Sequence, residues 1–257
     1  MKTIHSGLII AAAAILAGCG HNQELTFETL EDNGTYPLCE GCPSTFTFSA
    51  SIEYPAGGLE EATLRNLQEN FAEAVFGDGM RTYDIRAALE RYREASIENY
   101  VDSNLEGWEQ FGKDEEWGAS FTWQEIISTH FLGKYGDMQS CVISRYGFTG
   151  GAHGMDEDTA IVFDLKTGDP VSEDDIFEAG WESRIAESLT AHLRDSFEDE
   201  ETYNMLFVRE IEPNGNFFVT EQGITYIYGR YEIGPYVVGI VRVTIPWEEI
   251  KDLRRHS

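Results

Sequence analysis

The chain has 257 residues, of which 46 are acidic and 18 basic, so its formal net charge is −28. This charge argues against nucleic acid and against an anionic membrane surface as direct partners, because both would repel the protein. Roughly 210 residues follow the first 44, which is enough for one large domain or two small, closely packed ones.

Residues 1–18 are typical of an export signal. Lys2 precedes an apolar run from Leu8 to Leu16 that is too short for a permanent membrane helix. The run ends in Leu16-Ala17-Gly18-Cys19, which resembles the lipobox of bacterial lipoproteins. The resemblance implies cleavage before Cys19 and lipidation of its sulfur. Cleavage removes one basic residue and no acidic residue, so the net charge of the mature chain becomes −29.

Residues 19–44 are predicted to be a lipidated tether, because they show little hydrophobic periodicity and contain the turn sequence Asp32-Asn33-Gly34. We expect Cys39 and Cys42 to form a local disulfide outside the cytoplasm. A zinc site would need two further ligands, and the only thiol that remains is Cys141. A pairing of either cysteine with Cys141 stays open, although we expect Cys141 to be a buried thiol on a strand.

Residues 45–150 are predicted to form an N-terminal part with strands and helices. Thr45–Tyr54 alternates between apolar and polar residues, as a half-buried strand requires. A helix follows and ends at Gly77-Asp78-Gly79, and a second helix is predicted from Tyr83 to Tyr100. Both helices should pack on one face of a sheet. The polar segment Glu106–Gly118 is interpreted as a loop. The apolar stripe of the first helix is Leu64, Leu67, Phe71, Ala74 and Val75.

A β-hairpin is predicted next, with strands Phe121–Phe131 and Cys141–Phe148 joined by the turn Gly133–Asp137. The second strand runs into a loop in which three glycines lie within residues 150–154. Glycine tolerates positive φ angles and close approach of other backbone, so we expect a turn of unusual geometry there. His153 in this loop is interpreted as a hydrogen-bond partner of the loop backbone rather than as a catalytic group.

Residues 151–257 are predicted to form a C-terminal part. Its helix should run from Gly180 to Glu198, after a capped helical start at Ser172-Glu173-Asp174-Asp175. Asp195–Glu201 holds five acidic residues in seven, which is typical of a solvated helix end. The stripe predicted to be buried is Trp181, Ile185, Leu189 and Leu193. The other expected elements are strands Thr159–Asp164, Gly215–Thr220, Ile224–Tyr228 and Val237–Ile245, and a terminal helix Trp247–Arg254.

The sequence contains no recognisable catalytic or metal-binding motif. Of its six histidines, only His130, His153 and His192 fall in the predicted folded region. They form no zinc-protease pair, and the chain has neither a nucleophile elbow nor a phosphate-binding loop that precedes a lysine. Carboxylate pairs are abundant, but 46 acidic residues produce such pairs by chance. We therefore expect no enzymatic activity, no metal and no cofactor.

Several motifs occur in an order that resembles one group of proteins. They are Thr149-Gly150-Gly151-Ala152-His153-Gly154, Asp164-Leu165-Lys166-Thr167-Gly168, Asp174-Asp175-Ile176-Phe177, Tyr231-Glu232-Ile233-Gly234-Pro235-Tyr236 and Val243-Thr244-Ile245-Pro246. Over residues 45–255 the chain resembles the extracytoplasmic domain of RsiV-type lysozyme-binding anti-sigma factors. It also resembles the non-catalytic domains that precede the deacetylase module of PdaC-type peptidoglycan deacetylases. The resemblance implies an α+β fold, with an N-terminal strand and helices packed on an antiparallel sheet, then a C-terminal antiparallel sheet with one packed amphipathic helix.

The resemblance also implies a function: a lipid-anchored, non-catalytic binding or sensing module of the bacterial envelope, periplasmic or surface-exposed. Its ligand would be a cationic wall-directed protein such as lysozyme, or peptidoglycan, and the negative charge suits the former. The sequence shows neither a sigma-binding segment with a membrane helix nor the deacetylase motifs. The alternative is a cell-wall hydrolase or deacetylase with an unrecognised carboxylate site. The residues expected to bind are Thr149, Gly150, Gly151, His153, Tyr231, Glu232 and Tyr236.

Overall fold

The computed structural model of the protein describes residues 10–11, 24–112 and 118–255. It is a mixed α+β fold with two sheets, which confirms the predicted fold class. The chain divides into two compact units, which are described separately below. The first unit comprises residues 1–129 and 144–156, and the second comprises residues 130–143 and 157–257.

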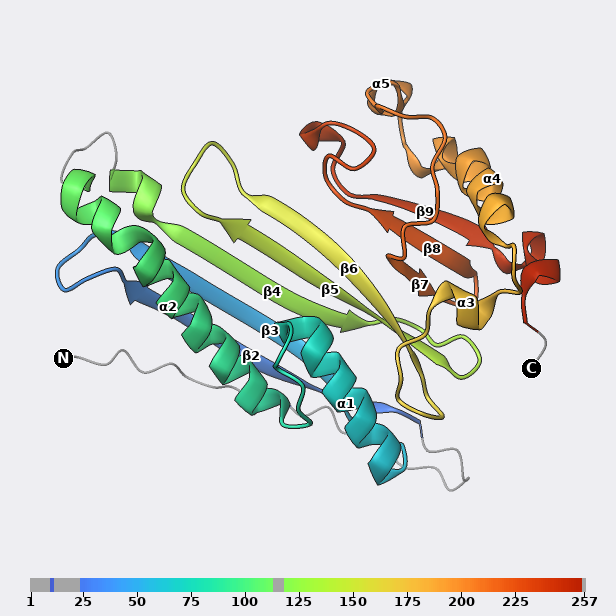
Figure 1. Cartoon of the computed structure of the whole chain (residues 1–257), viewed down its shortest axis with the longest axis horizontal. Coiled ribbons are helices and arrows are strands. Elements are labelled where there is room, and N and C mark those ends of the chain that lie inside the picture. Colours follow the sequence, from blue (N-terminus) through green and yellow to red (C-terminus); the bar gives the residue numbers. More distant parts are fainter. Residues whose placement is uncertain (1–9, 12–23, 113–117, 256–257) are drawn as a thin grey trace. The chain divides into compact units, whose positions relative to one another are not determined.

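The larger sheet contains its strands in sequence order (Figure 1). β2 and β3 form a long antiparallel pair, whereas β3 and β4 run parallel. The parallel pair differs from the antiparallel sheet that we expected, because the chain crosses over between these strands through two helices, the connection that parallel strands need. The strands are β1 (Ile10–Ala11), β2 (Thr26–Pro37), β3 (Thr45–Gly57), β4 (Trp123–Phe131), β5 (Met138–Phe148) and β6 (Met155–Asp164).

β2 corrects the prediction that residues 19–44 are a tether, since residues 26–37 are an integral strand paired with β3 along its whole length. The strand was missed because its buried face carries Asp32 and Gly34, which break the alternation of apolar and polar residues. Arg93 donates a hydrogen bond to the buried Asp32 carboxylate. The ring of Tyr36 lies against Gly34, where a Cβ would overlap it. The tertiary structure thus supplies partners that local periodicity does not reveal.

The turn between β2 and β3 holds the two cysteines of the Cys-x-x-Cys sequence. Cys39 and Cys42 are joined by a disulfide, with their Cα atoms 5.2 Å apart. The backbone N–H of Leu38 donates to the carbonyl of Ser44 at 3.0 Å and closes the turn. Cys141 lies on β5 as a fully buried thiol. Cys19 and residues 1–9 and 12–23 lie outside the described residues.

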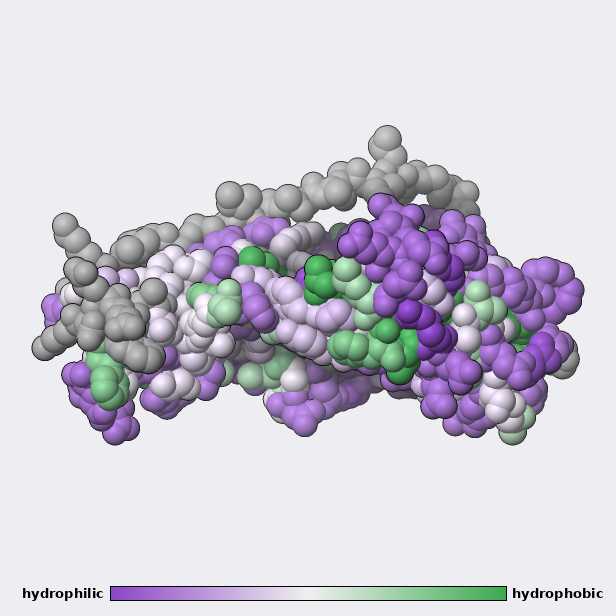
Figure 2. Space-filling model, turned by 90° about the horizontal axis from the view of Figure 1, so that it is seen from above, coloured by the Kyte–Doolittle hydropathy of each residue, from purple (hydrophilic) through white to green (hydrophobic). Residues whose placement is uncertain are grey.

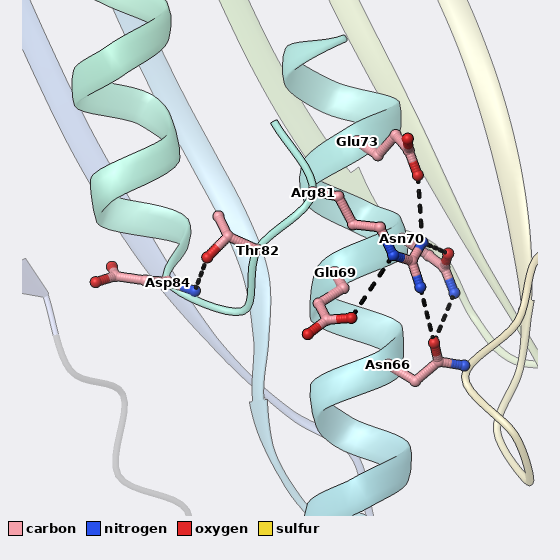
Figure 3. A network of polar contacts seen from close by, with 7 residues as sticks. All are labelled: Asn66, Glu69, Asn70, Glu73, Arg81, Thr82 and Asp84. Atoms are coloured by element: carbon pink, nitrogen blue, oxygen red, sulfur yellow. Dashed lines mark hydrogen bonds and ion pairs between the residues drawn. The ribbon is translucent and has the colours of Figure 1, made fainter. Parts of the chain in front are cut away.

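Two helices of the first unit cover one face of the sheet: α1 (Glu61–Phe76) and α2 (Ile85–Phe111) (Figure 1). Helix α1 ends at Gly77, as predicted, and buries Leu67, Phe71 and Val75 of its apolar stripe. Arg81, in the turn after α1, folds back onto that helix (Figure 3). Its guanidinium group contacts four side chains of α1, namely Asn66, Glu69, Asn70 and Glu73.

Helix α2 is longer than predicted. Asp84 caps its N-terminus by accepting a hydrogen bond from the backbone N–H of Ala87 at 3.0 Å. The helix continues to Phe111, so residues 106–111, which we interpreted as a loop, are helical. The indole of Trp108 packs edge-on against Phe121 with ring centroids 5.7 Å apart, next to the short 3₁₀ turn at residues 118–121. This contact with a distant residue packs a helix end whose polar sequence lacks the apolar periodicity by which a helix is predicted.

The second unit contains the smaller, antiparallel sheet, in the order β7, β8, β9. Helix α4 packs against β9 and buries Ile185 and Leu189, which form one core with Trp181 and Leu193 as predicted. Helix α4 ends at His192 rather than at Glu198. The predicted C-terminal helix consists of two 3₁₀ turns, at residues 247–249 and 251–253. The elements are α3 (Glu173–Ile176), α4 (Glu182–His192), α5 (Glu200–Asn204), β7 (Phe217–Val219), β8 (Gly223–Tyr228) and β9 (Val241–Pro246).

Asn216 covers the outer edge of β6 within the second unit. Its side-chain oxygen accepts from the backbone N–H of Ala160 at 2.8 Å, and its side-chain nitrogen donates to the carbonyl of Asp158 at 2.9 Å. Among the described residues, β6 is the last strand of its sheet, so the structure gives these two backbone groups no further strand to bond. The Asn216 amide therefore takes the place of a neighbouring strand, and Arg242 of β9 pairs with the Asp158 carboxylate beside it.

Candidate functional site

The glycine loop connects β5 to β6 in the first unit. Gly150 has a φ of +75°, and a Cβ there would overlap the backbone carbonyl of Ser120. A Cβ at Gly154 would overlap the ring of Tyr146. The ring nitrogen Nδ1 of His153 lies 3.2 Å from the carbonyl oxygen of Gly154, within hydrogen-bond distance of the loop backbone. Close packing of the chain therefore accounts for these two glycines.

The aromatic loop at residues 229–239 belongs to the second unit and is held by Glu232. One carboxylate oxygen of Glu232 accepts from the backbone N–H of Gly229 at 2.7 Å. The other accepts from the side chain of Asn214 at 2.8 Å. We predicted that Glu232 binds a ligand. In the structure, both of its carboxylate oxygens accept hydrogen bonds that hold the loop in place.

Within this loop, Tyr231 is turned outward by an unusual backbone conformation. It has a φ of +66° and is the one non-glycine residue with positive φ in the described part of the chain. Its side chain is 51% exposed. Its ring lies beside that of Tyr236, with centroids 5.9 Å apart, and the Arg230 guanidinium covers Tyr236 at 4.1 Å from the ring centroid. The loop therefore presents one half-exposed aromatic ring, next to a second ring that Arg230 covers.

A second segment, which the sequence analysis missed, lies against the aromatic loop. The backbone N–H of Phe207 donates to the carbonyl of Ile233 at 2.9 Å, and Leu206 and Ile233 are both buried in the core of the second unit. Phe207 is 62% exposed, and Val237 on the aromatic loop is 70% exposed. We call the exposed apolar side chains of the two segments the loop surface: Met205, Phe207, Val208, Tyr231 and Val237.

The loop surface has an acidic border. Residues 198–212 contain six acidic residues and one basic residue, Arg209. Arg209 donates to the backbone carbonyl of Tyr203 at 2.8 Å and stacks on that ring, so its guanidinium group is already engaged. In Figure 2, which views the molecule from above Figure 1, hydrophobic residues gather beside strongly hydrophilic ones in the part that holds α5 and the aromatic loop. One feature of the sequence could have indicated this segment: Met205-Leu206-Phe207-Val208 is an apolar run that follows shortly after an acidic stretch.

The predicted site residues do not form one site within a single unit. Thr149, Gly150, Gly151 and His153 belong to the first unit, whereas Tyr231, Glu232 and Tyr236 belong to the second. His192, also in the second unit, pairs with the Glu249 carboxylate at 2.9 Å. Within the described residues, no three or more His, Cys, Asp or Glu side chains gather in a way that could hold a metal ion. No helix in that part of the chain is long and apolar enough to span a membrane.

One stretch of the chain matches a known family model, and two solved structures share the fold. Residues 174–248 match DUF3298, described as a protein of unknown function. A solved member of the DUF3298 family from Bacteroides fragilis NCTC 9343 is 24% identical, with a TM-score of 0.81 over 91% of this chain and 95% of that chain. A DUF3298 family protein from Pseudomonas aeruginosa PAO1 is 19% identical, with a TM-score of 0.63 over 92% of this chain and 97% of that one. Comparison with curated proteins gives no match. Residues 174–248 therefore match the DUF3298 family model, and the chain shares its fold with these two structures.

Proposed function

We propose that the protein is a non-catalytic binding module of the bacterial cell envelope, anchored by lipid at Cys19, and that its loop surface captures a cationic wall-directed protein. The observation that carries this proposal is the exposure of the loop surface. Nine large hydrophobic side chains are exposed in the described residues, and five of them lie on these two contacting segments. Clustered exposed apolar side chains with a polar rim mark interaction sites in soluble domains.

The charge of the protein favours a cationic partner. The mature chain carries a net charge of −29, and the border of the loop surface has a strong local excess of acids. Such a field raises the rate of encounter with a basic protein and loses this effect as salt increases. Affinity that persists in salt must come from a few desolvated anchors, for which Phe207, Tyr231 and Val237 are placed. The resemblance to RsiV-type domains supplies lysozyme as the first candidate partner.

The test is calorimetry of the mature domain against lysozyme, at low and at physiological salt. We expect specific binding that weakens but persists at physiological salt. Phe207→Ala should weaken binding about 30-fold, which corresponds to a hot-spot loss of about 2 kcal/mol. Phe111→Ala is the matched control, because Phe111 is 56% exposed but lies in the first unit, outside the loop surface. Binding that vanishes at physiological salt, or that responds equally to both variants, would overturn the proposal.

Two further measurements separate this proposal from its alternatives. A cell-wall hydrolase or deacetylase would release or deacetylate muropeptides from peptidoglycan, and mass spectrometry would detect the products. Products that disappear in a Glu232→Gln or His153→Ala variant would establish an enzyme instead. For the anchor, Cys19→Ala should abolish incorporation of labelled palmitate and membrane partitioning. Continued labelling of that variant would rule out Cys19 as the lipid site.

A further inference from the structure

A pocket of about 540 Å³ lies in the second unit, away from the segments that form the loop surface. Its wall includes the turn after β4, the turn after β6, helix α3 and the segment that ends at Arg255. Backbone hydrogen bonds hold this last segment in place: Glu178 N–H donates to the Leu253 carbonyl at 2.8 Å, and Arg255 N–H donates to that of Ile176 at 2.9 Å. The pocket thus has a wall of defined position that carries two arginines, Arg254 and Arg255.

The guanidinium group of Arg254 rests on an aromatic stack. The rings of Tyr135 and Trp247 are nearly parallel, with centroids 4.4 Å apart. The guanidinium carbon of Arg254 lies 5.2 Å from the Tyr135 centroid and 5.3 Å from the Trp247 centroid. These contacts orient the guanidinium plane, but they do not use its N–H groups. Within the described residues, the Arg254 side chain has neither a hydrogen bond nor an ion pair.

The carboxylates of the pocket are already engaged. Asp137 pairs with Lys166 at 2.7 Å, and Asp164 accepts a hydrogen bond from the backbone N–H of Lys166 at 2.7 Å. Asp175 accepts from the hydroxyl and from the backbone N–H of Ser172, at 2.7 and 2.9 Å. These bonds from Ser172 are the main reason why the pKa of Asp175 is lowered, with a smaller contribution from the charge of Arg255. Although the chain has 46 acidic residues, Arg254 has no carboxylate partner in the part of the chain that the structure describes.

We propose that this pocket binds a small organic carboxylate, of the size of an acylated amino acid or dipeptide, through Arg254 and Arg255. The guanidinium fork matches a carboxylate geometrically, and stacking on Tyr135 preorganises it. Arg255 uses its Nε for the carbonyl of Phe177 at 3.0 Å, which leaves its terminal nitrogens for the ligand. The apolar residues of the lining, Met138, Val171 and Ile176, would contact the uncharged part of the ligand.

Two properties of the pocket select this ligand class. Its volume lies in the range of sites that hold small molecules, roughly 300–1,000 Å³. The lining carries as many carboxylates as cationic groups, so it offers no net positive charge to a doubly charged phosphate, and recognition rests on the planar fork of the guanidinium group, which matches a carboxylate. The site is independent of the proposed capture of a cationic protein, because it uses the guanidinium groups of Arg254 and Arg255, which are not part of the loop surface.

The test is a calorimetric titration, in which the mature chain is titrated with N-acetyl-alanyl-alanine at millimolar concentration. The C-terminal amide of the same peptide and inorganic phosphate are the comparison ligands. We expect the free acid to bind at least 10-fold more tightly than the amide and more tightly than phosphate. Equal binding of acid and amide, preferred binding of phosphate, or no binding of the acid would overturn the proposal.

Variants test the assigned residues. Arg254→Ala should weaken binding of the acid at least 10-fold, and Arg254→Lys, which keeps the charge but loses the fork, should weaken it measurably. Arg184→Ala removes the same charge from helix α4, where Arg184 pairs with Asp252 at 3.5 Å, and should leave binding unchanged. If Arg254→Ala unfolds the protein, the Arg254→Lys variant decides. Unchanged binding in the folded Arg254 variants, or the same loss in Arg184→Ala, would refute the assignment.

Discussion

At most positions, an alanine variant is more stable than a glycine variant. Because Tyr231 has a positive φ, we expect the opposite order of stability at this position. Tyr231 is the third residue of a tight turn that is closed by a hydrogen bond from the N–H of Glu232 to the carbonyl of Gly229, 3.2 Å long. A residue with a Cβ atom is destabilised by about 1–2 kcal/mol in the left-handed region, because the Cβ lies too close to the backbone, and glycine avoids this cost. Glycine instead loses about 0.5–1 kcal/mol more conformational entropy than alanine on folding. The difference makes Tyr231→Gly more stable than Tyr231→Ala by up to about 1.5 kcal/mol.

The comparison isolates the backbone, because both variants lose the same ring and the same contact with Tyr236. Tyr236 provides the control, since it begins a 3₁₀ turn and does not have a positive φ. At that position, alanine should be the more stable variant by about 0.5–1 kcal/mol. The free energies of unfolding are measured by urea denaturation of the four variants.

The same experiment separates stability from binding. Tyr231→Gly and Tyr231→Ala should bind a cationic partner equally weakly, because neither carries the exposed ring. If Tyr231→Ala is as stable as Tyr231→Gly, or more stable, then the turn does not hold Tyr231 under strain. The exposed ring would then need another structural explanation.

Three further predictions concern stability. Gly150→Ala should cost about 2 kcal/mol or more in the free energy of unfolding, because the new Cβ would meet a backbone carbonyl at a positive φ. Gly133→Ala, in open space, should be nearly neutral, and equal effects in urea denaturation would contradict the packing explanation. Asn216→Ala should cost about 1–3 kcal/mol by leaving two backbone groups of β6 without partners, and a loss below about 0.5 kcal/mol would argue against its role as an edge cover. Burial raises the pKa values of Tyr92 and Tyr100 to about 12, so the stability they contribute is present below pH 10 and is lost as pH rises towards 12. Tyr100→Phe should flatten this alkaline loss, and an unchanged pH profile would contradict the assignment.

The sequence by itself determined the elements whose signal is local. The alternation at residues 45–54 predicts β3, and the helical spacing of Leu67, Phe71 and Val75 predicts α1 with its end at Gly77. The stripe from Trp181 to Leu193 predicts the buried face around α4 for the same reason. In each case one face of the element is buried, so its residue pattern alone reports the structure.

Only the tertiary structure decided the elements whose partners are distant in sequence. β2 carries Asp32 on its buried face, and this charge is tolerated because Arg93, 61 residues away, pairs with it. Helix α2 extends to Phe111, where Trp108 packs on Phe121, although its last turns carry no apolar stripe that predicts a buried helix face. The loop surface arises in the same way, since Phe207 meets the aromatic loop through the backbone of Ile233. Such contacts join residues that are distant in sequence, and the local periodicity of the sequence does not show which distant residues will meet.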